Sequence, residues 1–298
     1  MAENRTNVRL LYGLVSAVGA VSPRAAGRLA FELFCITGAR RLPRFSTAPD
    51  AVERFWARGR QVTSYLWQGG GPTVLLVHGW GGGSGDLASF VSPLRDAGRR
   101  VVALDLPAHG RSPGRRLNLA QAAAAVEMCL RREPSVEAVI AHSFGVPATV
   151  LAAGKGAPLP RAVLISGPVS MEPYLQHFEQ VLELAPAVRR GIRERIRRVL
   201  TEGGIETMEL GAVAPRLSGR ALVIHDRGDR EVPFLSAQAL HRAWPEAELL
   251  ATEGLGHRRL LADPVVVERA VRFAVGWDGR EKERTAPAPA PDLRLVAS

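Results

Sequence analysis

Short, almost wholly apolar runs alternate with longer helical patterns through the middle of this chain, and this alternation limits the folds it can adopt. Runs such as the one at 73–77 lack the polar–apolar alternation of a half-exposed strand, which is typical of parallel strands covered on both faces. We expect strands at 60–67, 73–78, 100–105, 136–141, 161–166, 220–225 and 248–252, and helices at 86–97, 118–132, 143–153, 235–244 and 264–277. The pattern predicts an α/β fold with a mostly parallel central sheet and helices on both faces.

The alternation breaks once, and both ends of the chain differ from the middle. Residues 168–218 carry helical patterns without a strand, so we expect a small helical cap inserted into a core formed by 46–167 and 219–277. Residues 1–45 form an expected N-terminal helical extension with two amphipathic helices. The tail at 278–298 is rich in Ala and Pro, and we expect it to be disordered.

The composition excludes several partner classes. The 298 residues carry a net charge of +10, and only two of the 39 basic residues are lysines, Lys155 and Lys282. The basic residues show none of the interleaving with aromatic residues that single-strand binders use, so we expect no nucleic-acid partner. Two cysteines and seven histidines stand apart without metal-ligand spacing. We therefore expect no metal and no bound cofactor.

The N-terminal region bears on location. Its apolar run at 10–21 is too short to span a bilayer, and Glu3 lies where a signal peptide would be basic. A cytoplasmic protein is the expectation. Residues 8–44 are also suited to peripheral membrane contact, with an apolar face in the bilayer and arginines toward anionic headgroups. Packing on the main domain is the alternative, and the oligomeric state stays open.

The most informative motif is Ala141-His142-Ser143-Phe144-Gly145, which joins an apolar run to a helical pattern. A serine on such a turn is held in strained backbone geometry, and the small residues on either side let strand and helix approach closely. A serine nucleophile needs a base and an orienting carboxylate. Asp226 and Asp229 follow the expected strand at 220–225, and His257 follows the last strand. All would meet at the carboxyl edge of the sheet.

Four segments in register resemble motifs of the α/β-hydrolase superfamily, over residues 60–277. The segment 78–83 resembles the oxyanion loop, 105–112 the turn after the next strand, 141–145 the nucleophile elbow and 229–233 the acid loop. Ala141 departs from the glycine that is commonest at its position. The resemblance reaches the superfamily of serine hydrolases without selecting a substrate-defined family.

The resemblance implies a role for each matching residue. Ser143 would attack an acyl carbon, His257 would carry the proton, and Asp229 would orient the imidazole, with Asp226 as the weaker candidate acid. The backbone N–H groups of Trp80 and Phe144 would bind the oxyanion. The partner would be a small-molecule ester or acyl substrate.

Substrate choice would depend on the cap. Apolar side chains recur there at helical spacing and could roof a substrate pocket or simply pack the cap on the core: Met171, Tyr174, Leu175, Phe178 and Leu182. A carboxylesterase or lipase-like enzyme is the leading hypothesis. A serine peptidase or amidase of the aminopeptidase type is the alternative, with cap carboxylates such as Glu172, Glu179 and Glu183 to hold an amine. A non-catalytic ligand-binding or membrane-associated protein on the same scaffold is a further alternative. Thioesterase, haloperoxidase-like and C–C bond-cleaving chemistries also stay open.

Overall fold

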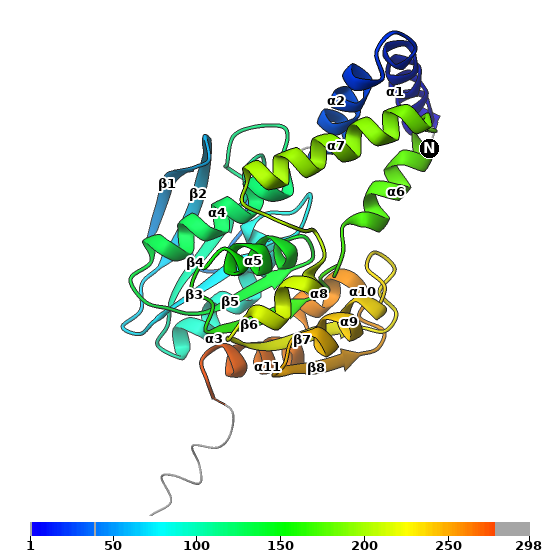
Figure 1. The fold of residues 1–298 in the computed structure, drawn as a ribbon. Helices are drawn as coiled ribbons and strands as arrows, with labels where there is room; N and C mark the ends of the chain where they lie inside the picture. Colours follow the sequence, from blue (N-terminus) through cyan, green and yellow to red (C-terminus); the bar gives the residue numbers. More distant parts are fainter. Residues whose placement is uncertain (1, 39, 278–298) are drawn as a thin grey trace, which may run out of the picture.

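An eight-stranded sheet occupies the centre of the computed structural model, which describes residues 2–38 and 40–277 (Figure 1). Its spatial order is β1-β2-β4-β3-β5-β6-β7-β8. The strands are β1 (Ala51–Ala57), β2 (Arg60–Trp67), β3 (Thr73–Val77), β4 (Arg100–Asp105), β5 (Val136–His142), β6 (Arg161–Ile165), β7 (Arg220–Asp226) and β8 (Ala247–Thr252). The expected tail at 278–298 lies outside the described residues.

The six strands β4, β3, β5, β6, β7 and β8 run parallel to one another, whereas β2 is antiparallel to both of its neighbours, β1 and β4. Strand β1 was not among the expected strands because its sequence mixes charged and apolar residues, as suits a strand at the edge of the sheet. It joins β2 through Arg58 and Gly59, whose φ angles of 44° and 70° fit a two-residue hairpin turn.

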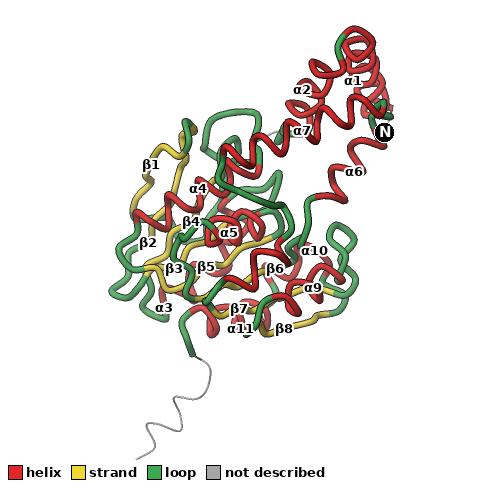
Figure 2. The backbone as a smooth tube through the Cα atoms, in the orientation of Figure 1, coloured by secondary structure: helices red, strands yellow, loops and turns green. Residues whose placement is uncertain are grey.

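Helices cover both faces of the sheet, which confirms the α/β fold class. On one face lie α4 (Leu119–Arg132), α5 (Gly145–Gly154) and α9 (Leu235–Ala243), and on the other α3 (Val91–Asp96) and α11 (Pro264–Ala274) (Figure 2). Neighbouring residues of a strand alternate between the two apolar clusters: Val77 faces α5 and α4, whereas Leu76 faces α3 and α11. Both are fully buried, which explains why the parallel strands read as continuous apolar runs.

The strand order reverses around β3. The chain passes from β3 to β4 on one side and then returns to pair β5 on the other side of β3. The crossover segments therefore leave on opposite faces and open a crevice at the carboxyl ends of β3 and β5, where sheets of this kind bind ligands. Ser143 follows β5, and the loop of Trp80 follows β3, so the topology brings these two expected site residues together.

Four helices form a layer above this crevice (Figure 1). Two come from the segment 168–218, α6 (Glu172–Val181) and α7 (Pro186–Glu202), and two from the N-terminus, α1 (Ala2–Val21) and α2 (Pro23–Phe34). Helix α2 packs along α7 at a point where both carry glycine: a Cβ on Gly27 would lie 2.6 Å from the carbonyl carbon of Gly191. Among the described helices, none has both the length and the hydropathy to cross a bilayer.

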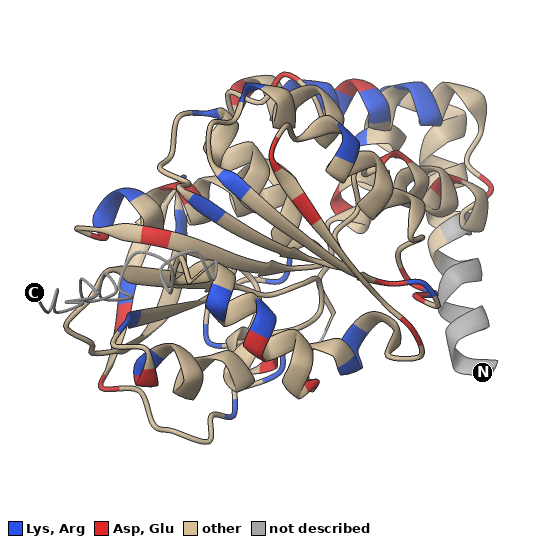
Figure 3. Ribbon diagram, turned by 90° about the horizontal axis from the view of Figure 1, so that it is seen from below, with Lys and Arg blue, Asp and Glu red and all other residues tan. Residues whose placement is uncertain are grey.

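Charged side chains are distributed over most elements. Lys and Arg are interspersed with Asp and Glu in Figure 3, and many form ion pairs, such as Arg99 with Glu137 and Arg193 with Glu179.

Candidate functional site

Ser143 occupies a strained turn between β5 and α5. Its φ of 51° lies in the left-handed region, which costs a non-glycine residue about 1–3 kcal/mol. The turn is tight because the end of β3 lies directly against it: a Cβ on Gly145 would lie 2.6 Å from the Val77 carbonyl oxygen. Ala141 is fully buried on the preceding strand. The small residues on both sides of the serine thus fit this turn for the steric reason expected from the sequence.

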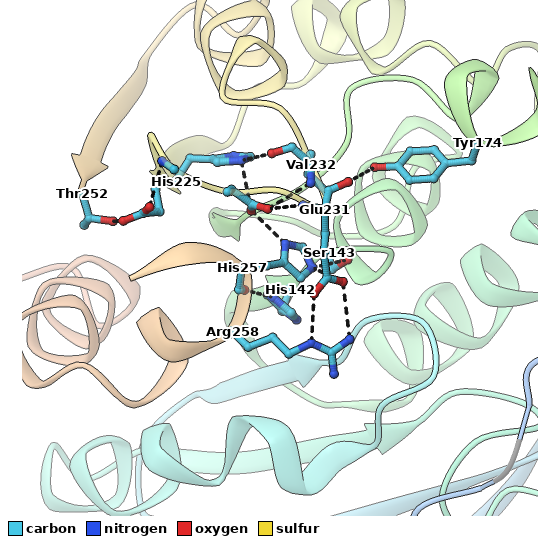
Figure 4. A network of polar contacts seen from close by, with 12 residues as sticks. His142, Ser143, Tyr174, His225, Glu231, Val232, Thr252, His257 and Arg258 are labelled. Carbon is cyan, nitrogen blue, oxygen red and sulfur yellow. Dashed lines mark hydrogen bonds and ion pairs between the residues drawn. The ribbon is translucent and has the colours of Figure 1, made fainter. Parts of the chain in front are cut away.

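The structure brings Ser143, His257 and Asp229 into one hydrogen-bonded chain (Figure 4). The Ser143 hydroxyl donates to His257 Nε2 at 3.1 Å, and His257 Nδ1–H donates to Asp229 Oδ2 at 2.8 Å. His257 lies in the first turn of a short helix, α10 (Gly256–Arg259), after β8, and Asp229 lies in the loop after β7. Three separate strand ends therefore supply the residues expected to act as nucleophile, base and orienting acid.

Asp229 is built to stay ionised. Its side chain is fully buried, and its Oδ1 accepts the backbone N–H groups of Glu231 and Val232 at 2.8 and 3.0 Å. Burial alone would raise the pKa of Asp229, but hydrogen bonds from His225, His257 and Val232 N–H hold it well below its usual range. A fixed negative charge at this point stabilises a protonated His257.

Asp226 has a different set of contacts. Its Oδ1 accepts Gly228 N–H at 2.9 Å, and its Oδ2 accepts the Thr252 hydroxyl at 2.8 Å and Leu255 N–H at 2.9 Å. These bonds tie the loop after β7 to the loop that carries His257. Between the two candidate acids, only Asp229 contacts the His257 ring.

His142, beside the nucleophile, also touches His257. Its Nε2–H donates to the His257 backbone carbonyl at 2.9 Å, and the two rings lie 4.8 Å apart. Burial, with a contribution from the neighbouring His257, lowers the pKa of His142 to about 3. This neutral imidazole fixes the backbone of the proposed base, a contact that the sequence did not reveal.

The loop after β3 is held over Ser143 by buried histidines. His78 Nδ1–H donates to the Gly79 carbonyl at 2.7 Å, and Gly81 N–H donates to His109 Nε2 at 3.0 Å. Burial, together with His78, lowers the pKa of His109 to about 4. A Cβ on Gly79 would lie 2.8 Å from the Ser143 Cβ, so only glycine lets this loop approach so closely.

This approach brings together the two residues that are expected to supply the oxyanion donors. The rings of Trp80 and Phe144 meet edge to face at 5.0 Å, and both residues line the same cavity as Ser143. Within residues 2–38 and 40–277, neither backbone N–H donates to a protein acceptor. Two uncommitted donors beside a serine are what a developing oxyanion requires.

A cavity of about 680 Å³ opens above Ser143. Of the expected pocket residues, Met171, Tyr174 and Leu175 line it, whereas Phe178 is not a lining residue and packs edge to face against Phe34 at 5.2 Å. Phe34 itself lines the cavity, as does Phe31 of the same helix. Sequence reasoning missed the contribution of α2, because an amphipathic pattern does not say which surface its apolar face covers.

Polar residues also line the cavity near the proposed base. Arg258 forms an ion pair with Glu231 at 3.3 Å, and Glu231 Oε2 lies 3.7 Å from His257 Nε2. The Tyr174 hydroxyl donates to the Glu231 carbonyl at 3.4 Å. Among the described residues, including those around His257, no group of three or more His, Cys, Asp or Glu could hold a metal ion.

Comparisons with known proteins agree with this architecture. A family model described as "Alpha/beta hydrolase family" matches residues 74–270. Among solved structures, a membrane phospholipase A described as a bacterial virulence factor is 17% identical and superposes with a TM-score of 0.57 over 96% of this chain and 100% of its own. An esterase from Exiguobacterium antarcticum is 15% identical, with a TM-score of 0.58 over 76% of this chain and 99% of its own. At these identities the likeness concerns the fold.

Two curated relatives match short segments. The dihydrolipoyllysine-residue acetyltransferase component of the acetoin cleaving system of Cupriavidus necator is 44% identical over 81 residues, which are 26% of this chain and 21% of that protein. The pimeloyl-[acyl-carrier protein] methyl ester esterase of Methylococcus capsulatus is 51% identical over 45 residues, 15% of this chain and 17% of its own. The chain thus spans about a fifth of the length of the curated relatives it matches.

Proposed function

The chain belongs to the alpha/beta hydrolase family, and we propose that within it the protein is a serine hydrolase that cleaves carboxylic esters through an acyl-enzyme on Ser143. The observation that carries the proposal is the continuous hydrogen-bonded chain from Ser143 through His257 to the buried carboxylate of Asp229, at the base of a cavity. A serine, a base and an orienting acid in this geometry form the constellation of nucleophilic acyl transfer.

In the first half-reaction, the Ser143 oxygen attacks the ester carbonyl carbon while its proton passes to His257 Nε2. Asp229 holds the imidazole in the tautomer whose Nε2 is free to accept and stabilises the imidazolium that forms. The N–H groups of Trp80 and Phe144 receive the negative charge on the carbonyl oxygen. When the tetrahedral intermediate collapses, the proton on His257 goes to the leaving alcohol.

In the second half-reaction, water replaces the alcohol. His257 takes a proton from the water as its oxygen attacks the acyl carbon, and the proton then returns to the Ser143 oxygen as the carboxylic acid leaves. The carboxyl edge of the sheet supplies every group that these steps need, so water is the sole co-reactant.

The cavity favours an ester over a peptide with a free amino terminus. We propose that residues 168–218 act as the cap that selects the substrate, but the cap carboxylates that could hold an amine do not line the cavity among the described residues. Glu172 and Glu179 both pair with Arg193, at 2.7 and 2.9 Å. Met171 and Leu175 line it instead, so the cap presents apolar surface to the substrate.

Hydrolysis of p-nitrophenyl butyrate tests the proposal. Ser143→Ala should lower kcat at least 10³-fold, because the nucleophile is lost. Ser166→Ala is the matched control: Ser166 also follows a parallel strand with a positive φ of 49° and is fully buried, yet its hydroxyl contacts no acceptor. Faster cleavage of an aminoacyl p-nitroanilide than of the ester would favour the peptidase, and folded protein with no turnover of either would favour the binding protein.

We also propose that the enzyme works in the cytoplasm in peripheral contact with a membrane, with the apolar part of the contact made by α1. Leu14 is 50% exposed and Val21 is 89% exposed on this helix, whereas the apolar face of α2 packs against α7. Arg24 and Arg28 are exposed nearby and suit anionic headgroups.

Sedimentation with phosphatidylglycerol vesicles tests this contact. The double variant Leu14→Asp/Val21→Asp should lower the bound fraction of the full chain at least fivefold. Val52→Asp changes a residue of similar exposure (45%) on β1 and should leave it unchanged. Equal sedimentation of all three proteins would refute the contact.

A further inference from the structure

We propose that the N-terminal helix α2 is a wall of the substrate site, and that α2 and α7 together enclose an aliphatic acyl chain of about ten carbons or more. The inference rests on the proposed function, because it takes Ser143 as the point where the ester carbonyl reacts. It adds a substrate class and assigns to α2 a role in specificity.

The cavity is continuous from the proposed nucleophile to α2. The space that reaches Ser143 and His257 is also lined by Phe31 and Phe34, more than one hundred positions earlier in the sequence. Phe31 is only 5% exposed and lines this space. The N-terminal segment is therefore part of the same site as the proposed nucleophile.

The side chains that α2 and α7 contribute to the cavity are apolar. The residues that α7 contributes are Ile196, Val199 and Leu200, and those that α2 contributes are the two phenylalanines, all apolar. The charged lining residues come from the core instead, among them Glu231 and Arg258 beside His257. A bound ester thus meets charged groups near its reacting centre, and every side chain that α2 and α7 themselves contribute to the cavity is apolar.

The volume of the cavity suits a long acyl chain. A water-sized group takes about 30 Å³ in a condensed phase, and a methylene is of similar size, so about 680 Å³ holds roughly twenty such groups. An acetyl or butyryl ester would leave most of this apolar surface without contacts. Each further methylene that becomes buried should improve binding about fourfold, until the space beneath the helices is filled.

Contacts with the cap and with the core fix the position of α2. The backbones of α2 and α7 meet at Gly27 and Gly191, and Phe34 packs on Phe178 of α6. At the end of α2, Leu117 N–H donates to the Cys35 carbonyl at 2.8 Å. These contacts join α2 to both cap helices and to the core, so the wall keeps a defined distance from Ser143.

The experiment compares p-nitrophenyl butyrate with p-nitrophenyl decanoate. Wild type should have the higher kcat/KM for decanoate. Phe34→Trp should lower the decanoate-to-butyrate ratio about tenfold, because the larger ring takes the space of about two methylenes, while butyrate changes less than threefold. Gly27→Ala, which would push α2 off α7, should lower the ratio as well. Gly13→Ala adds a methyl group to α1 in open space and should leave the ratio unchanged.

A binding measurement separates this inference from the proposed reaction. Calorimetry of sodium decanoate should show binding to Ser143→Ala, and about tenfold weaker binding to Ser143→Ala/Phe34→Trp, with melting temperatures recorded for both. The inference would be overturned if the decanoate-to-butyrate ratio were unchanged in Phe34→Trp and Gly27→Ala, or if Phe34→Trp left the affinity for decanoate unchanged. Neither result would contradict the proposed hydrolase activity. Decanoate binding that responds to Phe34→Trp in a chain that hydrolyses no ester would uphold α2 as the wall of an acyl-binding site and refute the proposed reaction.

Discussion

Replacing Asp229 with asparagine should disable the proposed base while leaving its position unchanged. In Asp229→Asn the side-chain oxygen can still accept the N–H groups of Glu231 and Val232, so the amide group must face His257 Nδ1 at 2.8 Å. Because the amide donates, Nδ1 must accept and Nε2 must carry the proton. Nε2 can then no longer accept the proton of Ser143. We expect kcat for p-nitrophenyl butyrate to fall about 10⁴-fold, or ~5 kcal/mol in activation free energy.

Asp226→Asn is the matched control, because it changes a buried carboxylate three positions earlier, at the end of β7. Its amide would face Leu255 N–H or the Thr252 hydroxyl, so we expect a loss of about 1–3 kcal/mol in the free energy of unfolding and less than a tenfold change in kcat. Urea unfolding and steady-state kinetics on both variants give the comparison. If Asp226→Asn abolished turnover and Asp229→Asn retained it, the assignment of the orienting acid would be refuted.

Three further predictions follow from the buried groups around the site. Gly145→Ala should lower the free energy of unfolding by about 1–3 kcal/mol and reduce kcat, because its Cβ would meet the Val77 carbonyl oxygen; Gly70→Ala, in open space, should change neither in thermal melts and assays. His142→Leu should lower kcat roughly fivefold through loss of the ~1 kcal/mol bond to His257, and His142→Gln should restore part of it; equal rates would contradict a positioning role. The pKa values of His109 and His142 are lowered to about 4 and about 3, so below pH 6.5 the unfolded chain binds more protons than the folded chain. The free energy of unfolding should therefore fall by ~2 kcal/mol per histidine between pH 6.5 and 5. Identical midpoints of urea unfolding at pH 7 and 5 would contradict this.

Much of the architecture follows from local signals. The parallel strands are buried on both faces, so apolar runs such as 73–77 reveal them directly. The start of the helix at 118–132 is predicted by Asn118 and Gln121, whose side chains cap each other's backbone N–H groups. The site could be anticipated for a topological reason, since motifs that follow parallel strands must meet at one edge of the sheet.

The remainder depends on contacts between distant segments. Phe31 and Phe34 read as one face of an amphipathic helix, and only the packing of α2 on α7 turns that face toward Ser143. Strand β1 has no apolar run because it lies at the edge of the sheet, half exposed. The link between His142 and the His257 carbonyl spans 115 positions and leaves no trace in either local sequence.

Covalent trapping of the nucleophile tests the central claim most directly. An alkyl fluorophosphonate should phosphonylate Ser143, with the serine oxygen bonding to phosphorus and fluoride leaving, and intact-mass spectrometry should show one label per chain in wild type and in Ser166→Ala. Ser143→Ala should carry none, and His257→Gln should react far more slowly because the base is lost. Folded wild-type protein that takes up no label, or Ser143→Ala that takes up as much as wild type, would contradict an activated serine at the end of β5.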